Sequence, residues 1–542
     1  MGASDAGDVN GGGAERGGVP RDPHPASADI AALDATALSG LFDAGELTAA
    51  GVVEQLVARI EVIDGGGAGT HAVIELAPDA LEVAATLDAE RRAGRRRGPL
   101  HGVPVLVKDN VDTVAPLHTS AGSLVFGASS PATDATLVKV LREAGAIVIG
   151  KANLSEWANF RSEMSSSGWS ARGGQTRNPH ALDRSPGGSS AGSGAAVAAR
   201  LVPLAVGTET DGSILCPAAA CGVAGLKPTL GLVSRTGIVP IAATQDTAGP
   251  LARSVRDLGL LLGVLADAVD DGEDAAARRA GRPAGFDPAA WAQQGADGIA
   301  GLRIGVVRDG GYAGYHRPTD EAFGVALDAL REVGAEIVDP VEGLGPPSTW
   351  EEDELTVLLY EFRAGMEAYL GRRADATPGH PDLPRTLADI LDHAGREPRE
   401  RADRFDTELI ARAAATDGLG ADLYLAALDR IKRATRTDGL DTVFAAGVDL
   451  VAVPAMSPAW PIDHVLGDHV AGAGWSPAAV AGYPSAALPV GTVGGLPVSI
   501  ALLGPPWSEP LLLGALAALE SALGSAITAP VPAFVGSLSL DR

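Results

Sequence analysis

Short apolar segments alternate with helical segments along this 542-residue chain, and this alternation restricts its fold more than any other feature. In the first half, Val103 to Val107, Ala146 to Gly150 and Pro203 to Val206 are predicted strands, and Asp134 to Glu143 and Gly192 to Leu201 are predicted helices. Later strands are expected at Leu302 to Val307, Asp449 to Val453, Ala486 to Val490 and Pro497 to Leu503. The order predicts an α/β fold built on a layered sheet.

The chain ends and a central segment depart from this alternation. Residues 1–29 are rich in Gly, Asp and Pro and poor in large apolar residues, which predicts a disordered tail. Residues 30–542 are expected to form one large domain. Within it, about 345–440 is mostly helical and charged and is predicted to be a helical insertion. Near the start, Thr48 is a predicted N-cap.

Charge and composition exclude several classes of protein. A net charge of −26 disfavours binding to nucleic-acid phosphates, and the basic run Arg91 to Arg97 is interpreted as the end of a helix and a loop. No apolar run of 18 residues lacks charge, so no membrane span is expected, and the N-terminus does not resemble a secretory signal. Cys216 and Cys221 are expected to be reduced. A cytoplasmic location follows from these features.

Three separate stretches contain residues that together can perform acyl transfer. Lys108 ends an apolar strand, where burial would lower the pKa of its amine and let it act as a general base. Ser189 and Ser213 lie in glycine-rich turns further along the chain. Gly212 precedes Ser213, and consecutive backbone N–H groups in such a turn can hold an oxyanion.

Other interpretations of these residues are weaker. The turn around Ser189 lacks the pattern of a P-loop. A Ser-His-Asp triad could use His101, His464 or His469, but neither serine lies in a G-x-S-x-G elbow. The histidines also lack the spacing of a helical metal pair. The lysine and the two serines therefore predict an amide hydrolase that requires no metal or organic cofactor.

The chain resembles the amidase signature family over roughly 30–265 and 445–520. The motifs are Pro186 to Ser190, Gly207 to Pro217, Gly225 to Thr229, Ala481 to Pro484 and Gly495 to Val498. The resemblance implies a large mixed β-sheet flanked by helices on both faces. It also implies roles at matching positions: Ser213 as nucleophile, Ser189 as a bridging serine after a cis peptide bond, Lys108 as base, and the backbone N–H groups of Thr210, Asp211 and Gly212 as the oxyanion hole.

Several segments resemble the peptide-amidase branch of this family. They are Asn153 to Arg161, Gly168 to Thr176, Gly207 to Ile214 and Gln245 to Pro250. The resemblance implies a peptide or small-molecule amide as substrate, with the C-terminal amide of peptides or of amino acids released as ammonia through an acyl-enzyme. The alternatives are the amidase subunit of a tRNA-dependent amidotransferase and a non-catalytic binding protein on the same scaffold. A monomer or a homodimer is expected.

Overall fold

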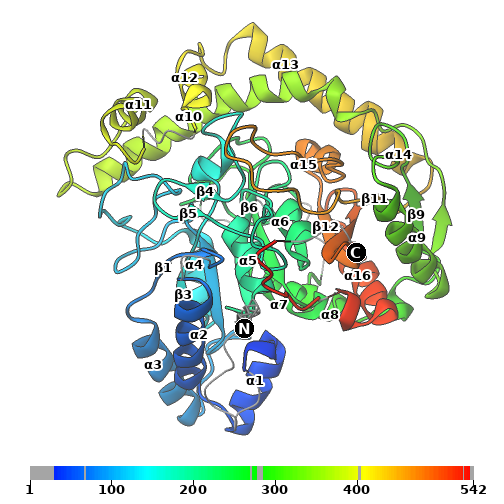
Figure 1. The fold of residues 1–542 in the computed structure, drawn as a ribbon, viewed down its shortest axis with the longest axis horizontal. Helices are drawn as coiled ribbons and strands as arrows, with labels where there is room; N and C mark the ends of the chain where they lie inside the picture. The colour runs from blue at the N-terminus through cyan, green and yellow to red at the C-terminus, as the bar shows by residue number, and fades with distance from the viewer. Residues whose placement is uncertain are drawn as a thin grey trace, which may run out of the picture.

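The computed structural model describes residues 30–65, 69–268, 272–277, 285–400, 405–528 and 530–537. The predicted tail, 1–29, lies outside the described residues. A mixed sheet of eleven strands forms the centre of this part of the chain, in the order β1-β3-β2-β6-β8-β7-β12-β13-β11-β9-β10 (Figure 1). The sheet confirms the predicted α/β class.

The strands of the sheet are β1 (Val73–Leu76), β2 (Pro104–Lys108), β3 (Ile147–Ala152), β6 (Leu204–Glu209), β7 (Ala224–Lys227), β8 (Thr247–Ala252), β9 (Arg303–Val306), β10 (Glu336–Val338), β11 (Leu450–Pro454), β12 (Ser485–Val493) and β13 (Leu496–Leu503). A small separate hairpin joins β4 (Trp169–Ser170) and β5 (Gly174–Gln175).

The helices are α1 (Ala35–Ala44), α2 (Ala49–Ile63), α3 (Ala80–Arg92), α4 (Thr136–Glu143), α5 (Ala191–Ala198), α6 (Leu215–Cys221), α7 (Val255–Leu265), α8 (Pro288–Trp291), α9 (Arg317–Glu332), α10 (Glu351–Ala376), α11 (Leu387–Arg396), α12 (Glu408–Ala414), α13 (Asp422–Lys432), α14 (Asp441–Ala445), α15 (Ser476–Ala481), α16 (Glu509–Leu523) and α17 (Ser525–Thr528).

Strands β2, β3 and β6 form one of two parallel parts of the sheet, and each is buried along its whole length. The other parallel part consists of β9, β10 and β11. Continuous apolar runs of this kind suit strands that are covered on both faces. The register pairs Val105 with Leu204 and Val107 with Val206, so β2 and β6 end side by side. The residues that follow β2 and β6, which are far apart in the sequence, therefore lie close together at the carboxyl ends of these strands.

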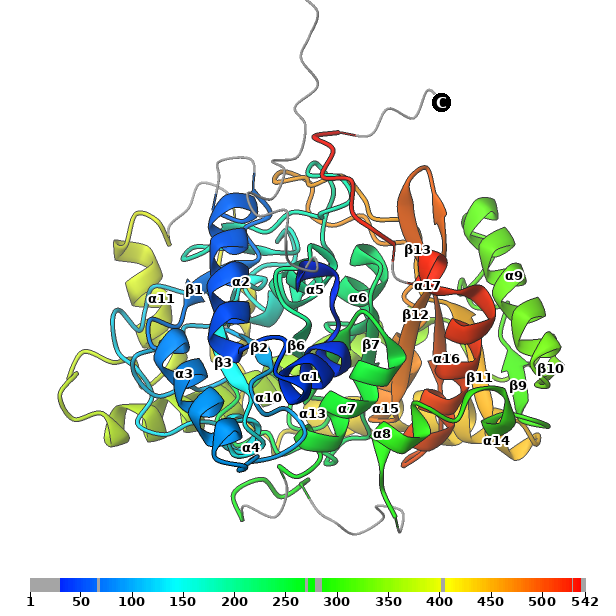
Figure 2. The ribbon, with the colours of Figure 1, turned by 90° about the horizontal axis from the view of Figure 1, so that it is seen from below.

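Helices cover both faces of the sheet (Figure 2). Helices α5 and α6 pack together and contact β2, β3, β6, β7, β12 and β13, whereas α7, α8 and α16 form a second group. Thr48 accepts a hydrogen bond from the backbone N–H of Gly51, which confirms the predicted cap of α2. Cys216 and Cys221 are buried free thiols, as expected. No helix among the described residues is long and apolar enough to cross a membrane.

The predicted insertion contains α10 to α13, and α10 and α13 run together along one side of the molecule (Figure 1). Tyr369 on α10 donates a hydrogen bond to Asp112 at 2.7 Å. After α11, Glu400 accepts from the hydroxyl of Ser123 and from the guanidinium of Arg161, which also pairs with Glu156. These charged groups are almost fully buried. The insertion therefore contacts the rest of the molecule through buried polar groups as well as apolar ones.

Candidate active site

The last residue of β2 lies beside the end of β6. Lys108 is fully buried, and its amine lies 2.7 Å from the Ser189 hydroxyl. The same amine lies 2.9 Å from the Thr208 hydroxyl and 3.2 Å from the Thr208 carbonyl. Two of the three predicted residues are therefore in direct hydrogen-bond contact, although 81 positions separate them in the sequence.

Burial lowers the pKa of the Lys108 amine to about 7, and nearby Glu209 and Asp246 oppose this shift. A charged ammonium loses its hydration when it is buried, so the neutral form gains weight. A substantial fraction of the amine is then uncharged near neutral pH. This is the protonation state that a general base needs, and its pKa lies close to the working pH.

Ser189 lies in a tightly packed turn just before α5. The peptide bond between Gly188 and Ser189 is cis, as the resemblance implied. A Cβ placed on Gly188 would lie 2.6 Å from the hydroxyl oxygens of both Ser155 and Ser167, so only glycine fits there. The Ser189 carbonyl also accepts from the backbone N–H of Ser155 at 3.1 Å. These contacts fix the position of the serine that contacts Lys108.

Ser213 lies next to this turn. The backbone N–H of Ser190 donates to the carbonyl of Ser213 at 3.0 Å, so the main chains of the two predicted serines are adjacent in space. Ser213 is itself buried, with 7% of its surface exposed. The structure thus places the lysine and both serines at one location, at the carboxyl ends of β2 and β6.

The turn that leads from β6 to Ser213 has an unusual shape. Gly212 has a φ of +75°, and a Cβ there would lie 2.1 Å from the indole nitrogen of Trp475. Among the described residues, none accepts a hydrogen bond from the backbone N–H of Thr210 or Asp211. The backbone N–H of Gly212 faces the Glu209 carboxylate. Two of the three predicted oxyanion donors are therefore free to bind an anion.

Glu209, the last residue of β6, stabilises the same turn through its side chain. One of its carboxylate oxygens accepts from the backbone N–H groups of Ile214 (2.7 Å) and Leu215 (3.0 Å), at the start of α6. Burial raises the pKa of Glu209, whereas Lys227 and these hydrogen bonds lower it. The carboxylate therefore holds the segment after Ser213 in place.

The side chains of the turn contact acidic groups outside it. The Thr210 hydroxyl donates to Asp246 at 2.6 Å, and the Asp211 carboxylate accepts from the Ser476 hydroxyl at 2.5 Å. Burial raises the pKa of Asp211, and the nearby Glu354 carboxylate on α10 raises it further. The insertion thus contributes a buried acidic side chain close to the turn.

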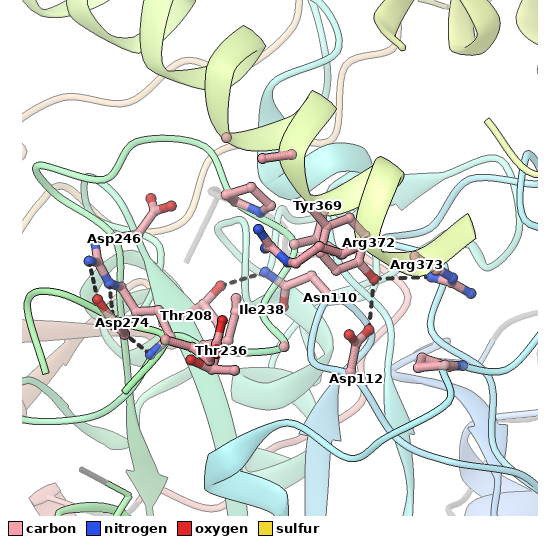
Figure 3. A pocket seen from close by; sticks show the side chains of 18 of the residues that line it. Asn110, Asp112, Thr208, Thr236, Ile238, Asp246, Asp274, Tyr369, Arg372 and Arg373 are labelled. Atoms are coloured by element: carbon pink, nitrogen blue, oxygen red, sulfur yellow. Dashed lines mark hydrogen bonds and ion pairs between the residues drawn. The ribbon is translucent and has the colours of Figure 1, made fainter. Parts of the chain in front are cut away.

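Sequence reasoning gave no role to Thr208 and Asn110. Asn110 donates to the Thr208 hydroxyl at 3.0 Å, and this is the hydroxyl that contacts Lys108 (Figure 3). The two residues therefore orient the lysine amine. Their positions held a signal, because Asn110 follows Lys108 by two residues and Thr208 is in the Gly-rich motif before Ser213.

The histidine alternative has no support in the geometry. His101 interacts with the carbonyl of Leu87, His464 with the side-chain carbonyl of Gln175, and His469 with the Asp463 carboxylate at 3.7 Å. No cluster of His, Cys, Asp or Glu that could hold a metal ion occurs among the residues that the structure describes. Lysine is therefore the one basic side chain that contacts a predicted serine within the described site.

Comparison with known proteins shows the family to which the chain belongs. A family model described as Amidase matches residues 51–513. The chain is 36% identical to a probable amidase from Arabidopsis thaliana, with 83% of each chain covered. It is 37% identical to the A subunit of the glutamyl-tRNA(Gln) amidotransferase from Symbiobacterium thermophilum, covering 89% of this chain and 95% of that one.

Solved structures give a similar result. The native peptide amidase from Stenotrophomonas maltophilia is 44% identical, with a TM-score of 0.84, over 91% of this chain and 98% of that one. A peptide amidase bound to the competitive inhibitor chymostatin is also 44% identical, with a TM-score of 0.86, over 93% and 99% of the two chains. The fold, the matched length and these identities show that this chain is an amidase hydrolase of the amidase signature family.

Proposed function

We propose that the chain hydrolyses amides with a Ser213–Ser189–Lys108 triad. The observation that carries the proposal is the buried, weakly basic amine of Lys108, 2.7 Å from the Ser189 hydroxyl and beside the turn of Ser213. A lysine with a lowered pKa can take a proton through a bridging hydroxyl, which removes the need for histidine.

The reaction begins with proton transfer along this row of groups. Neutral Lys108 accepts the proton of Ser189, and Ser189 takes the proton of Ser213 as the Ser213 oxygen attacks the amide carbonyl. The negative charge that develops on the carbonyl oxygen is stabilised by the N–H groups of Thr210 and Asp211, together with that of Gly212 if it turns away from Glu209.

Collapse of the tetrahedral intermediate breaks the carbon–nitrogen bond. Ser189 returns a proton to the leaving nitrogen, and ammonia departs from a primary amide. Water then loses a proton to the same groups and attacks the acyl-Ser213 ester, which releases the carboxylic acid and restores the serine.

The substrate that we propose is the C-terminal amide of a peptide, or an amino-acid amide. The similarity to peptide amidases, one of them bound to a competitive inhibitor, supports this class. A second candidate is the amidase subunit of a tRNA-dependent amidotransferase, because the corresponding amidotransferase subunits are 33–37% identical over about nine-tenths of this chain. That candidate requires a tRNA-binding partner.

The triad is tested by covalent labelling with a fluorophosphonate probe. The wild-type protein should be labelled, and Ser213→Ala should lose both the label and several orders of magnitude in turnover. Ser193→Ala is the matched control, since it also removes a buried serine hydroxyl, which donates to the carbonyl of Val206. Labelling that persists in Ser213→Ala would assign the nucleophile elsewhere.

The substrate is tested by measuring ammonia release from amidated dipeptides, amino-acid amides, simple aliphatic amides and free glutamine. We expect the highest kcat/KM with the amidated dipeptides. Preference for glutamine, together with stable co-purification of a tRNA-binding protein, would favour the amidotransferase subunit. Preference for aliphatic amides would reject the peptide class and leave the triad intact.

A further inference from the structure

The peptide unit between Thr210 and Asp211 is held from its carbonyl side. The bond is trans, so the Thr210 carbonyl and the Asp211 N–H point in opposite directions. A partner on the carbonyl therefore also fixes the direction of the N–H. The side-chain nitrogen of Gln245 is that partner, at 3.4 Å from the Thr210 carbonyl oxygen. Gln245 is completely buried and lies 35 positions further along the chain.

A carboxylate of the helical insertion holds Gln245 in turn. The same side-chain nitrogen of Gln245 lies 2.8 Å from the Glu354 carboxylate on α10. An amide nitrogen carries two hydrogens, so the carboxylate and the Thr210 carbonyl accept one each. Glu354 is also buried, with 8% of its surface exposed. A hydrogen-bonded path therefore runs from α10 to the turn that precedes Ser213.

The residue after Gln245 holds Thr210 at a second point. The Thr210 hydroxyl donates to Asp246 at 2.6 Å, and Asp246 also accepts from two backbone N–H groups of its own loop. Consecutive residues thus contact the carbonyl and the hydroxyl of Thr210. Asp246 also opposes the lowering of the Lys108 pKa by burial. Replacement of Gln245 therefore tests the contact with the turn without this effect on the lysine.

Helix α10 contacts the same loop at a further point that does not reach the turn. Glu361 accepts from the backbone N–H of Thr244 at 2.9 Å and from the Thr244 hydroxyl at 3.0 Å. Within the described part of the chain, neither residue forms a hydrogen bond with residues 210–213. The Thr244 hydroxyl joins the same loop to the same helix, and it therefore offers a matched control.

We propose that Gln245 and Glu354 are positioning residues for the oxyanion hole. Gln245 turns the peptide unit so that the Asp211 N–H points at the oxygen on which negative charge develops, and Glu354 fixes Gln245. The inference rests on the proposed function, in which this N–H binds the oxyanion. An oxyanion donor acts mainly on the transition state, so loss of Gln245 should lower kcat and leave KM nearly unchanged.

The experiment compares the steady-state kinetics of the full chain and of its variants on an amidated dipeptide. Removal of one oxyanion donor costs about 10²–10³-fold in kcat, and a misdirected donor costs less. We therefore expect Gln245→Leu to lower kcat by at least about tenfold, with KM within about twofold of the wild type. Glu354→Met should also lower kcat by about tenfold, and Glu354→Gln, which keeps an oxygen acceptor for Gln245, should restore most of it. Thr244→Ala should keep the wild-type kcat and KM.

A peptide aldehyde gives a second measurement that a loss of folding stability would not reproduce. The Ser213 oxygen adds to the aldehyde carbon while its proton passes through Ser189 to Lys108, and the aldehyde oxygen takes the place of the oxyanion. The affinity for acetyl-alanyl-alaninal should fall in Gln245→Leu in proportion to kcat/KM. The affinity for the corresponding alcohol, which has no carbonyl to be attacked, should stay at the wild-type value and shows that the variant is folded.

Three results would overturn the inference: an unchanged kcat in Gln245→Leu, a raised KM at constant kcat in this variant, or equal losses in Glu354→Gln and Glu354→Met. Failure of the proposed function gives a different result. If Ser213 is not the nucleophile, the wild type and Ser213→Ala bind the aldehyde equally and hydrolyse the dipeptide amide at the same rate, whatever the Gln245 variant does.

Discussion

Replacing Lys108 by Met should change how the free energy of unfolding depends on pH. The folded state holds the amine at a pKa of about 7, whereas the ordinary value is 10.5. The folded pKa is thus depressed, so the unfolded chain binds more protons between these values. The contribution of Lys108 to the free energy of unfolding therefore rises with pH between about 7 and 10.5.

The magnitude follows from the size of the shift. A group with these two pKa values destabilises the folded state by about 4 kcal/mol at pH 7 and by about 2 kcal/mol at pH 9. Lys108→Met removes this cost but also removes three hydrogen bonds of about 1 kcal/mol each. The variant should then differ little from the wild type at pH 7. The free energy of unfolding of the variant minus that of the wild type should fall by about 2 kcal/mol between pH 7 and pH 9.

The measurement is urea unfolding of both proteins at several pH values between about 7 and 9. Contributions from other buried lysines cancel in the difference between the two curves. Lys139→Met serves as the control, because it removes a lysine amine from an exposed position on α4. If the difference in free energy of unfolding between the wild type and Lys108→Met is constant with pH, the lowered pKa of Lys108 is refuted. Its role as general base is then refuted as well.

Three further predictions concern activity and stability. The kcat/KM of the wild type should fall about tenfold per pH unit below an apparent pKa of about 7, because protonated Lys108 cannot accept a proton; an acid limb well away from 7 would contradict this. Gly212→Ala should abolish activity, because its Cβ would clash with Trp475. Its control is Gly94→Ala, at a φ of +74° with open space around it, which should only lower the free energy of unfolding, by about 1 kcal/mol. Glu400→Gln should lower the free energy of unfolding by about 3 kcal/mol by breaking a buried ion pair, and a loss below about 1 kcal/mol in urea titration would show that the contact contributes little.

Strands β2, β3 and β6 could be predicted from the sequence because each begins with a continuous apolar run. Strands β7 and β8 were not predicted, since Gly225 interrupts the first, and Gly249 and Pro250 interrupt the second. Such residues weaken the strand pattern. The pairing of these two strands with their neighbours stabilises them in spite of their composition, and that pairing is a tertiary effect.

The candidate site was predictable in its chemical groups but not in its surroundings. Lys108, Ser189 and Ser213 were identifiable from motifs, because each lies in a distinctive local sequence. The bond from Asn110 to Thr208 was not, because it depends on two strands about 100 residues apart becoming neighbours. The approach of Trp475 to Gly212 similarly joins segments with no local relationship in the sequence.

The adjacency of β2 and β6 has a consequence for the durability of the enzyme. The distance between the Lys108 amine and the Thr208 hydroxyl is set by the backbone hydrogen bonds that join β2 to β6, and not by mobile loops. Heat or denaturant can separate these groups only by pulling two interior strands apart. Loss of the contact between Lys108 and Thr208 should therefore coincide with unfolding of the whole sheet rather than precede it.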